Sequence, residues 1–389
     1  MDDRDLSALA GALGDADGYL VCADGEDPNQ RYVTDFDAPD PFLSVWTSEG
    51  VSLLVSELEY GRANAESRAA SVARLSDYDY RDRADVVGRR AARAGVAADW
   101  LADADVAAVK TPDRFPLGTA DRLREQGVSV ETDPNDAIEA ARAVKTETEI
   151  AHVRAAQEAN EAAFAAAAEL IRGAEVVDGV LRHDGESLAS ERVKVVIERT
   201  LLEHGCGLDE TIVACGEDAA DPHNRGSGPL RADEPIVVDI FPRSKTTGYH
   251  ADTTRTWVRG TPDERLAAWH RLTDEAREAA LAAVEPGVTG AEVHNAVCNV
   301  YESAGIPTLR AEPTAETGFI HSTGHGVGLA VHERPRVGPD GDELEPGNVI
   351  TIEPGLYNPT VGGVRIEDIV VVREGGYENL TSLPTGLAP

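Results

Sequence analysis

The order in which helices and strands are expected to follow one another occurs twice between residues 146 and 372. In each half, two helices precede a group of strands, and polar or glycine-rich turns separate the elements. Thr146 and Glu149 form a capping box at the first helix, and Thr289 caps the fourth. The repeat predicts an internal duplication in an α+β domain whose helices cover one side of a curved antiparallel sheet. The expected helices span 146–171, 188–204, 263–284 and 289–303, and the expected strands span 210–215, 236–241, 249–258, 319–321, 349–352 and 363–372.

Residues 1–138 follow a different pattern, in which short strands alternate with helices. This is the order of an α/β domain, and it lacks the glycine-rich loop of a phosphate-binding site. A polar loop at residues 133–136 places the boundary after residue 138, so that the second domain spans 139–389. In this part we expect strands over 18–23, 42–46, 51–55 and 105–109, and helices over 86–101 and 121–126.

Acidic residues outnumber basic ones by 70 to 36, which gives a formal net charge of −34. A chain this acidic repels nucleic-acid backbones and anionic membranes, so neither is expected as a partner. Only four of the 36 cations are lysines, and the others are arginines. Because molar salt screens self-repulsion, this composition predicts a halophilic protein from a high-salt cytoplasm.

The cysteines and the N-terminal segment exclude several other classes. The four cysteines show no CxxC spacing, so neither a zinc knuckle nor a disulfide framework is expected. The N-terminal segment is acidic and lacks a basic region followed by an apolar run, as a secretory signal would have. The alanine-rich stretch at 162–171 is shorter than a membrane span. We therefore expect a soluble cytoplasmic protein.

Two acidic residues lie in the segment PIVVDIFPRSKTTGYHADTTRTW, which has the pattern of two strands joined by a polar turn. Asp239 and Asp252 are 13 residues apart, and the midpoint between them falls in that turn. A regular hairpin would place them directly opposite each other, with Cβ atoms about 4.5–5.5 Å apart. Like charges repel at that distance, so the pair is costly unless a cation bridges it.

The segment VITIEPGLYNPTVGGVRIEDIV repeats this arrangement in the second half. Glu353 and Glu367 are 14 residues apart and are centred on Thr360 in the turn. Four carboxylates that converge on one site would hold two divalent cations, and His325, which lies between two glycines, is the natural nitrogen ligand. Such an oxygen-rich shell suits Mn²⁺, Co²⁺, Fe²⁺ or Zn²⁺.

With these five residues in place, the chain resembles the pita-bread metallopeptidases, which include Xaa-Pro dipeptidase (prolidase), aminopeptidase P, methionine aminopeptidase and creatinase. The resemblance covers about residues 140–380, and the preceding part is similar to the creatinase/prolidase N-terminal domain, with RYVTDF at 31–36. It implies a pita-bread catalytic domain. The extra N-terminal domain favours the branch of prolidase, aminopeptidase P and creatinase, and the complete ligand set disfavours a creatinase-like reaction.

The resemblance also implies roles for single residues. In it, Asp252 and Glu367 would bridge two metal ions, and Glu353 would also be the general base for a metal-bridging hydroxide that attacks the carbonyl preceding proline. The implied metal ligands are Asp239, Asp252, His325, Glu353 and Glu367. Outside this set, His332 and His321 would donate hydrogen bonds to the oxyanion, His223 would contact the substrate or shuttle a proton, and Arg365 would orient a carboxylate.

The resulting hypothesis is a dinuclear-metal exopeptidase that cleaves Xaa-Pro peptides, with Mn²⁺ as the expected metal and, by resemblance, a homodimer as the expected assembly. One alternative is a pita-bread hydrolase of a non-peptide C–N bond, in an acylated amino acid or a compatible solute. Another is a non-catalytic binding protein on the same fold, which the complete ligand set disfavours. The motifs do not distinguish a dipeptide from a longer peptide substrate.

Overall fold

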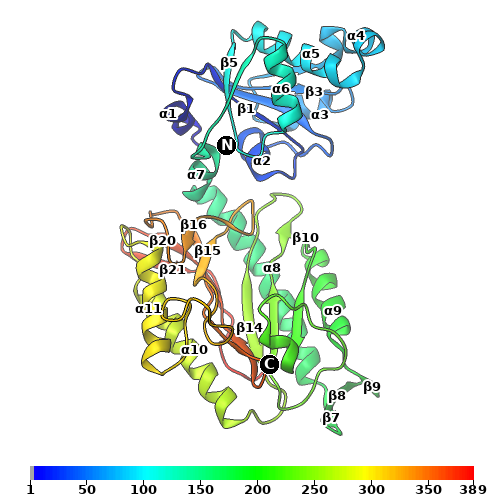
Figure 1. Cartoon of the computed structure of the whole chain (residues 1–389). Coiled ribbons are helices and arrows are strands. Elements are labelled where there is room, and N and C mark those ends of the chain that lie inside the picture. Colours follow the sequence, from blue (N-terminus) through cyan, green and yellow to red (C-terminus); the bar gives the residue numbers. More distant parts are fainter. Residues whose placement is uncertain (1–3) are drawn as a thin grey trace. The chain divides into compact units, whose positions relative to one another are not determined.

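The computed structural model describes residues 4–389, and the chain divides into two compact units. The first unit ends at Arg142, and the second spans Ala143–Pro389. Figure 1 shows the first unit in blue to cyan and the second in green to red. Each unit has its own hydrophobic core, so each is described by itself.

The first unit is built on a six-stranded mixed sheet with the strand order β4-β3-β2-β1-β5-β6. The three central strands β1, β2 and β3 are antiparallel, and the outer strands pair in parallel with their neighbours. This mixture of helices with a partly parallel sheet is the predicted α/β pattern. The strands are β1 (Gly18–Ala23), β2 (Phe42–Thr47), β3 (Gly50–Val55), β4 (Ser71–Arg74), β5 (Ala108–Thr111) and β6 (Ser129–Thr132). The helices are α1 (Ala10–Leu13), α2 (Pro28–Thr34), α3 (Tyr60–Glu66), α4 (Tyr80–Val87), α5 (Arg89–Asp103), α6 (Leu117–Glu125) and α7 (Ala137–Ala143).

Two local predictions for this unit are wrong. The single helix expected over 86–101 is divided between α4 and α5, because Gly88 has φ +82°, which a continuing helix does not allow. The strand expected over 105–109 begins only at Ala108, because Asp105 has φ +57° and belongs to a turn. Both errors arise at residues whose backbone conformation ends an element although the apolar pattern continues.

The second unit contains four long helices in two pairs, as the repeated order predicts. The two pairs are α8 with α9 and α10 with α11, and Figure 1 shows the members of each pair together. The predicted capping box forms, since the Thr146 hydroxyl accepts from the Glu149 N–H. Thr289 caps α11 as predicted, and its hydroxyl accepts from the Glu292 N–H in a second capping box. The helices are α8 (Glu147–Arg172), α9 (Ser190–Glu203), α10 (Glu264–Ala282) and α11 (Gly290–Ser303).

The strands that follow each helix pair are antiparallel. The first half has the sheet β11-β12-β14, and the second half has the sheet β16-β15-β17-β20-β21 together with the hairpin β18-β19. The strand expected over 319–321 is absent; β15 forms a few residues later instead. The first-half strands are β11 (Ile212–Cys215), β12 (Ile236–Ile240) and β14 (Thr253–Trp257). The second-half strands are β15 (Gly324–Gly326), β16 (Glu333–Val337), β17 (Val349–Ile352), β18 (Gly355–Asn358), β19 (Gly362–Arg365), β20 (Asp368–Arg373) and β21 (Gly376–Asn379).

Short strands complete the first half of this unit. Three of them, β7 (Glu175–Val177), β8 (Val180–His183) and β9 (Glu186–Ser187), form a small sheet of their own. Two more, β10 (Cys206–Gly207) and β13 (Arg243–Ser244), pair with each other. The strand β13 lies in the connection between β12 and β14, so that connection is more than a turn.

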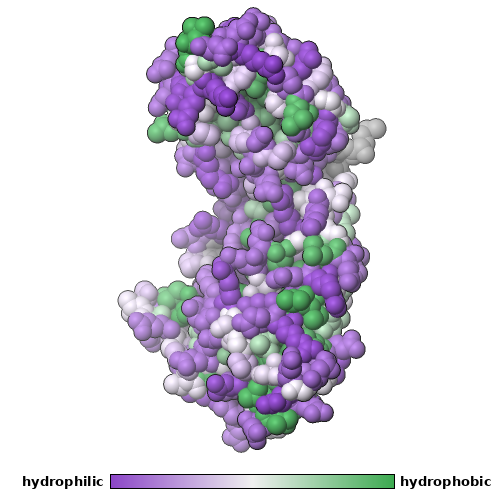
Figure 2. Space-filling model, turned by 90° about the vertical axis from the view of Figure 1, so that its right-hand side faces the viewer, coloured by the Kyte–Doolittle hydropathy of each residue, from purple (hydrophilic) through white to green (hydrophobic). Residues whose placement is uncertain are grey.

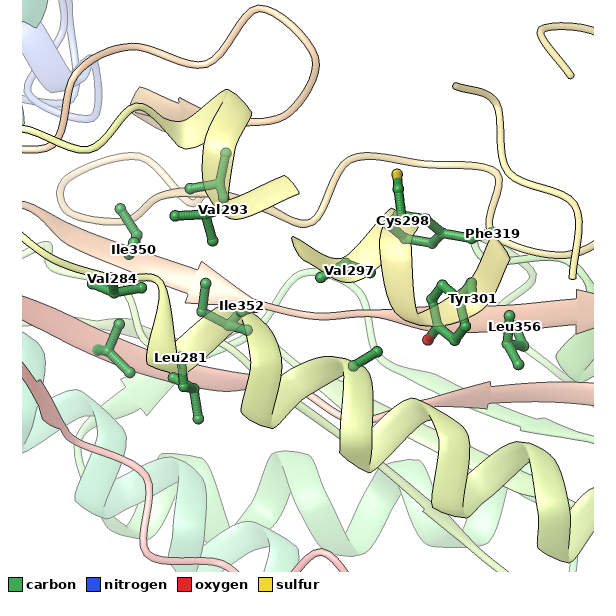
Figure 3. Close-up of a cluster of buried hydrophobic side chains, with 14 of the residues drawn as sticks. Leu281, Val284, Val293, Val297, Cys298, Tyr301, Phe319, Ile350, Ile352 and Leu356 are labelled. Carbon is green, nitrogen blue, oxygen red and sulfur yellow. The ribbon is translucent and has the colours of Figure 1, made fainter. Parts of the chain in front are cut away.

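Each half of the second unit buries its helices against its own strands. In the first half, side chains such as Phe164 of α8 and Ile197 of α9 pack with Val238 of β12. In the second half, Leu281 and Val297 contribute to a cluster that includes strands β17 and β18 (Figure 3). Fully burying one such side chain stabilises a fold by about 1.5–3 kcal/mol. The two separate cores are what a structural duplication predicts.

The surface agrees with the acidic composition. On the face shown in Figure 2, hydrophilic residues predominate and hydrophobic residues form small separate groups. Among the helices of residues 4–389, none combines the length and the apolar character that crossing a membrane requires.

Candidate metal centre

The first pair of acids lies on β12 and immediately before β14. Asp239 is opposite Thr254, so it is not directly opposite Asp252, and the predicted register is wrong by two residues. The connection between the strands is irregular because its strand β13 pairs with β10. A shift by two residues keeps side chains on the same face of the sheet. Asp252 is therefore the diagonal neighbour of Asp239, and both carboxylates still lie on one face.

The second pair has the predicted register. The strand pairs on either side of it, β17 with β20 and β18 with β19, share a register that places Glu353 opposite Glu367. At these two residues the ladder is interrupted. The N–H of Glu353 donates to the Thr323 carbonyl at 2.7 Å, and the N–H of Glu367 donates to the Thr254 carbonyl at 3.0 Å. Because Thr254 belongs to β14, Glu367 joins the two halves of the unit at this point.

His325 lies on β15 between two glycines that leave no room for a side chain. A Cβ atom at Gly324 or Gly326 would lie 2.0 or 2.2 Å from a backbone carbonyl oxygen of the neighbouring chain segments. The close packing brings the imidazole to the acids: its Nε2 lies 3.4 Å from Glu353 Oε1 and 3.7 Å from Asp252 Oδ2. The predicted nitrogen ligand therefore lies among the predicted oxygen ligands.

Three of the five candidate ligands are close enough to share one ion. One side-chain atom from each of Asp252, His325 and Glu367 lies within 4.8 Å of the others. Asp239 and Glu353 line the same cavity as these three. The two halves of the unit thus bring their acids to one place.

One buried guanidinium, that of Arg365, accompanies the four carboxylates. Its Nη2 donates to Asp239 Oδ2 at 2.6 Å, and its Nε donates to the Thr254 hydroxyl at 3.0 Å. The Thr254 hydroxyl in turn donates to Glu367 Oε2 at 2.8 Å. The other oxygen of Asp239, Oδ1, is buried and has no hydrogen-bond partner among residues 4–389. Arg365 therefore holds Asp239 by one oxygen and leaves the other oxygen available to a ligand.

Burial and the crowding of like charges disturb the titration of these groups. Burial raises the pKa of Asp252 and of Glu367 well above the usual values, and the neighbouring carboxylates raise both further. Burial also raises the pKa of Glu353 to about 7. Burial lowers the pKa of His325 to about 3, so its imidazole is neutral at pH 7 and can act as a metal ligand.

The donor set fits divalent metal ions. Three buried carboxylates and the partly exposed Glu353 face one guanidinium, and this excess of negative charge is costly unless cations balance it. The unpartnered oxygen of Asp239 points to a missing partner as well. Carboxylate oxygens with one imidazole are the ligands of hard and borderline divalent ions such as Mn²⁺, Co²⁺, Fe²⁺ and Zn²⁺.

A cavity of about 880 Å³ opens at these side chains. The structure brings all nine of the residues that the sequence singled out to the walls of this cavity: Asp239, Asp252, His325, Glu353, Glu367, His223, His321, His332 and Arg365. Apolar side chains such as Phe241, Ile320 and Val331 also line it. The cavity can therefore bury an apolar ligand group beside the carboxylates.

His321 lies in a directed chain of hydrogen bonds. Arg365 Nη1 can only donate, and it lies 2.9 Å from the Tyr357 hydroxyl, which lies 3.1 Å from His321 Nε2. His321 Nδ1 lies 2.7 Å from the Ser322 carbonyl oxygen, which can only accept. Nδ1 therefore carries the proton, and Nε2 accepts from Tyr357. In this arrangement, neither ring nitrogen of His321 is free to donate to a substrate.

His332 and His223 have a different environment. The His332 ring lies edge-on to the His325 ring, with centroids 4.2 Å apart, and its side chain is exposed to the cavity. No hydrogen bond of the His332 ring is found within residues 4–389. His223 lies on the cavity wall after β11, in a turn where its N–H donates to the Asp221 carboxylate. His332 can therefore donate to a ligand in the cavity without losing another partner.

Sequence reasoning missed two residues of this site. Thr254 links Arg365 to Glu367, and its position two residues after Asp252 on the same strand face could have revealed it. Tyr357 connects Arg365 to His321, and no pattern in the sequence indicates that contact.

Comparisons with known proteins support this description. A model of "Metallopeptidase family M24" matches residues 151–374, and a model of the "Creatinase/Prolidase N-terminal domain" matches residues 6–155. A probable dipeptidase PepE of Mycobacterium tuberculosis is 36% identical over 251 residues, which cover 64% of this chain and 61% of that protein. The Xaa-Pro dipeptidase of Pyrococcus horikoshii is 29% identical over 363 residues, or 92% of this chain and 91% of that protein.

Solved structures agree with the sequence comparisons. The crystal structure of the prolidase from Pyrococcus horikoshii superimposes with a TM-score of 0.77 and 27% identity, over 98% of this chain and 99% of that one. A substrate complex of Escherichia coli aminopeptidase P, at 20% identity and a TM-score of 0.75, shares the fold. The family match extends over more than half of the chain and contains all nine predicted site residues. The chain belongs to metallopeptidase family M24 and combines its pita-bread domain with a creatinase-type N-terminal domain.

Proposed function

We propose that this protein is a metal-dependent exopeptidase that hydrolyses the bond preceding proline in Xaa-Pro peptides. The observation that carries the proposal is the group of four carboxylates that line one cavity with His325, three of them buried, with one guanidinium and an unpartnered carboxylate oxygen. The names of the relatives, a probable dipeptidase and Xaa-Pro dipeptidases, support the substrate class. The aligned part spans only 61% of the first of these relatives, so the activity is inferred from the site as well.

The five candidate ligands would hold two divalent ions, with Mn²⁺ as our first choice. Asp252 and Glu367 lie with His325 in one cluster, which supports their assignment as the shared ligands. Asp239 would complete the shell of one ion, and His325 and Glu353 would complete that of the other. Bound divalent cations would activate a water molecule and polarise the scissile carbonyl.

The other side chains would position the substrate and move protons. Glu353 is our candidate for the general base, because its Oε1 lies beside His325 at the cavity wall. His332 would donate to the oxyanion, since its ring has no other hydrogen bond among the described residues. His321 would act through Tyr357 to hold Arg365, and His223 would contact the substrate. Arg365 orients Asp239.

The arginines of the cavity favour a dipeptide substrate. Arg365 pairs with Asp239, and Arg225 pairs with Glu210. Arg336 also lines the cavity and is exposed, and within residues 4–389 its guanidinium has no carboxylate partner. A free guanidinium at the wall would bind the terminal carboxylate of an Xaa-Pro dipeptide, which lies one residue beyond the scissile bond.

Three further proposals concern the whole protein. We assign residues 1–138 as the creatinase/prolidase-like domain and 139–389 as the catalytic domain, and the two family matches support this order of domains. We propose that the protein works as a homodimer. The net charge of −34 supports activity in the high-salt cytoplasm of a halophile.

The test is hydrolysis of an Xaa-Pro dipeptide beside an Xaa-Pro-Yaa tripeptide, in molar KCl with MnCl₂. We expect the dipeptide to be cleaved, EDTA to stop the reaction, and Glu353→Ala to lower kcat by about 10³-fold or more. Arg336→Met should raise KM for the dipeptide, while the matched change Arg225→Met should not. Cleavage of the tripeptide alone would identify an aminopeptidase. If neither peptide is cleaved by the metal-loaded protein, hydrolysis of another C–N bond becomes the better proposal.

A further inference from the structure

One of the four lysines of the chain is buried. The side chain of Lys145, the residue before the N-cap of α8, is 1% exposed, although lysines are rarely found inside proteins without a partner. Its Nζ lies 2.6 Å from Glu333 Oε1, and the Glu333 side chain is 2% exposed. Nζ also donates to the Ala143 carbonyl at 3.3 Å. The two charges are therefore enclosed together within the second unit.

The Glu333 carboxylate organises the turn that leads to it. Its Oε2 accepts from the Ala330 N–H at 3.1 Å, and the Gly328 N–H donates to the Ala330 carbonyl at 3.0 Å. At Gly328 a Cβ atom would lie 2.2 Å from Glu333 Oε1 and 3.0 Å from Lys145 Cε. Residue 328 must be glycine so that the ion pair can lie against the backbone.

The turn carries His332, which is adjacent to Glu333. The His332 ring lies edge-on to His325, and the Gly328 carbonyl accepts from the His250 N–H at 2.8 Å. The ion pair thus lies behind the segment that places one histidine over the candidate metal centre. Breaking a buried pair is costly, whereas an apolar pair of similar volume is often equally stable. Stability alone therefore does not require these two charges here.

We propose that Lys145 and Glu333 are positioning residues, whose buried ion pair fixes the turn at 328–333 and so holds His332 in place to contact the substrate. The role of His332 in contacting the substrate rests on the proposed function. The position of the His332 ring does not, because it can be measured without any substrate. Lys145 acts only through Glu333, and neither residue lines the cavity.

The choice of lysine supports this role. Of the 36 basic residues only four are lysines, so arginine is the common cation of this chain. Lys145 Nζ has two acceptors, Glu333 Oε1 and the Ala143 carbonyl. The Lys145 side chain already lies so close to the backbone at Gly328 that a Cβ atom there would be 3.0 Å from Lys145 Cε. An arginine would have to fit a rigid planar group with five N–H donors into the same space. Lys145→Arg keeps the charge and should nevertheless displace the turn.

The experiment compares Lys145→Met, Glu333→Gln and the double variant Lys145→Met/Glu333→Gln with the wild type. Each single variant leaves one buried charge without its partner and should lower the melting temperature, and the double variant should recover much of that loss. In the double variant, kcat should stay reduced by about 10- to 100-fold while KM changes little, because a displaced His332 weakens contacts made in the transition state. The matched control is Lys110→Met, which breaks the exposed Lys110–Glu131 pair in the first unit.

A second measurement does not depend on activity. In metal-free protein labelled at its ten histidines, the imidazole signals of His332, assigned by their loss in His332→Asn, should shift in the double variant and not in Lys110→Met. If the wild type cleaves no Xaa-Pro peptide but these signals shift, the proposed function fails and the positioning role stands. A double variant with wild-type kcat and unshifted His332 signals overturns the proposal. A double variant that does not fold overturns it as well, because the pair would then serve stability alone.

Discussion

Two clusters of charged side chains lie on opposite faces of the same chain segments, and they differ in the balance between positive and negative charge. Thr254 and Glu367 point towards the candidate metal centre, whereas the next residues along the chain, Arg255 and Asp368, point to the opposite face. The cluster at the metal centre has four carboxylates and one guanidinium. The cluster behind it has two arginines, Arg255 and Arg277, and two aspartates, Asp274 and Asp368.

The rear cluster is complete without any ligand. All five N–H donors of Arg255 have acceptors, including Asp368 Oδ1 at 2.8 Å and the Glu367 carbonyl at 2.5 Å. The other oxygen of Asp368 accepts from Arg277 Nη1 at 2.8 Å and from the Asn379 amide at 3.0 Å. Burial of charge alone therefore does not indicate a functional site. What distinguishes the candidate metal centre is that the negative charges of its side chains outnumber the positive ones.

The largest expected effect is on the balanced cluster. Asp368→Asn removes the charge that pairs with Arg255 and turns one oxygen into a donor that faces Arg277. Leaving a buried guanidinium without its counter-ion should lower the free energy of unfolding by about 3–5 kcal/mol. Chemical denaturation at pH 7.5 would measure it. Arg154→Met, which removes the partly exposed ion pair with Glu378, is the control and should cost less than about 1 kcal/mol. A loss of that small size in Asp368→Asn would show that the rear cluster is not held by its charges.

The sequence predicted the unbalanced cluster better than the balanced one. Glu353 and Glu367 flank a turn that is symmetrical about Thr360, so spacing alone gives their register. The register of Asp239 and Asp252 could not be obtained in this way, because β13 pairs with a strand outside the hairpin. Four of the five hydrogen bonds of the Arg255 guanidinium reach residues 112 to 129 positions away, two of them the carbonyl groups of Leu383 and Pro384, and no local sequence pattern predicts them.

The fold, like the register of Glu353 and Glu367, was predictable because its signals lie close together in the sequence. Helix caps such as Thr146 and Thr289 and the alternation of helices and strands are local signals, and they identified the duplication. The errors at Gly88 and Asp105 came from single residues with positive φ, which interrupt an element without changing its apolar pattern. Tyr357 was missed because its role depends on contacts with His321 and Arg365, which only the fold provides.

The next largest effect is the pH dependence of stability that Glu353 causes at the candidate metal centre. Burial raises the folded-state pKa of Glu353 from 4.5 to about 7 in the metal-free protein. The folded protein then retains a proton that the unfolded chain releases, so this contribution to stability is complete below pH 4.5 and is lost as the pH rises through about 7. Relative to Glu353→Gln, the metal-free wild type should lose about 3 kcal/mol between pH 4.5 and 8. Denaturation of both proteins in EDTA would measure this, and a difference independent of pH would contradict it.

Binding of Mn²⁺ should offset the excess negative charge of the candidate metal centre and so stabilise the folded protein. A ligand present at 100 times its Kd stabilises the folded state by about 2.7 kcal/mol, so MnCl₂ should raise the melting temperature of the wild type. Glu367→Gln should abolish the increase, because Glu367 belongs to the candidate cluster. Asp368→Asn, one residue further along the chain, should be less stable but should gain the same increment from Mn²⁺. If Glu367→Gln responds to Mn²⁺ as the wild type does, the ions bind elsewhere.

The smallest effect separates the two aspartates of one hairpin. In the metal-free protein the pKa of Asp252 is raised by burial and by the neighbouring carboxylates, so Asp252→Asn should increase the free energy of unfolding at pH 8 by about 1 kcal/mol or more. Asp239 differs because it pairs with Arg365 at 2.6 Å, so Asp239→Asn removes an attractive contact and should lower stability. Denaturation in EDTA would compare them. If both variants are destabilised, the repulsion between the Asp252 carboxylate and the neighbouring carboxylates is weaker than its attraction to Arg365. Opposite signs within one hairpin would show that negative charge at this centre is retained at a cost to stability, which is what binding of a cation requires.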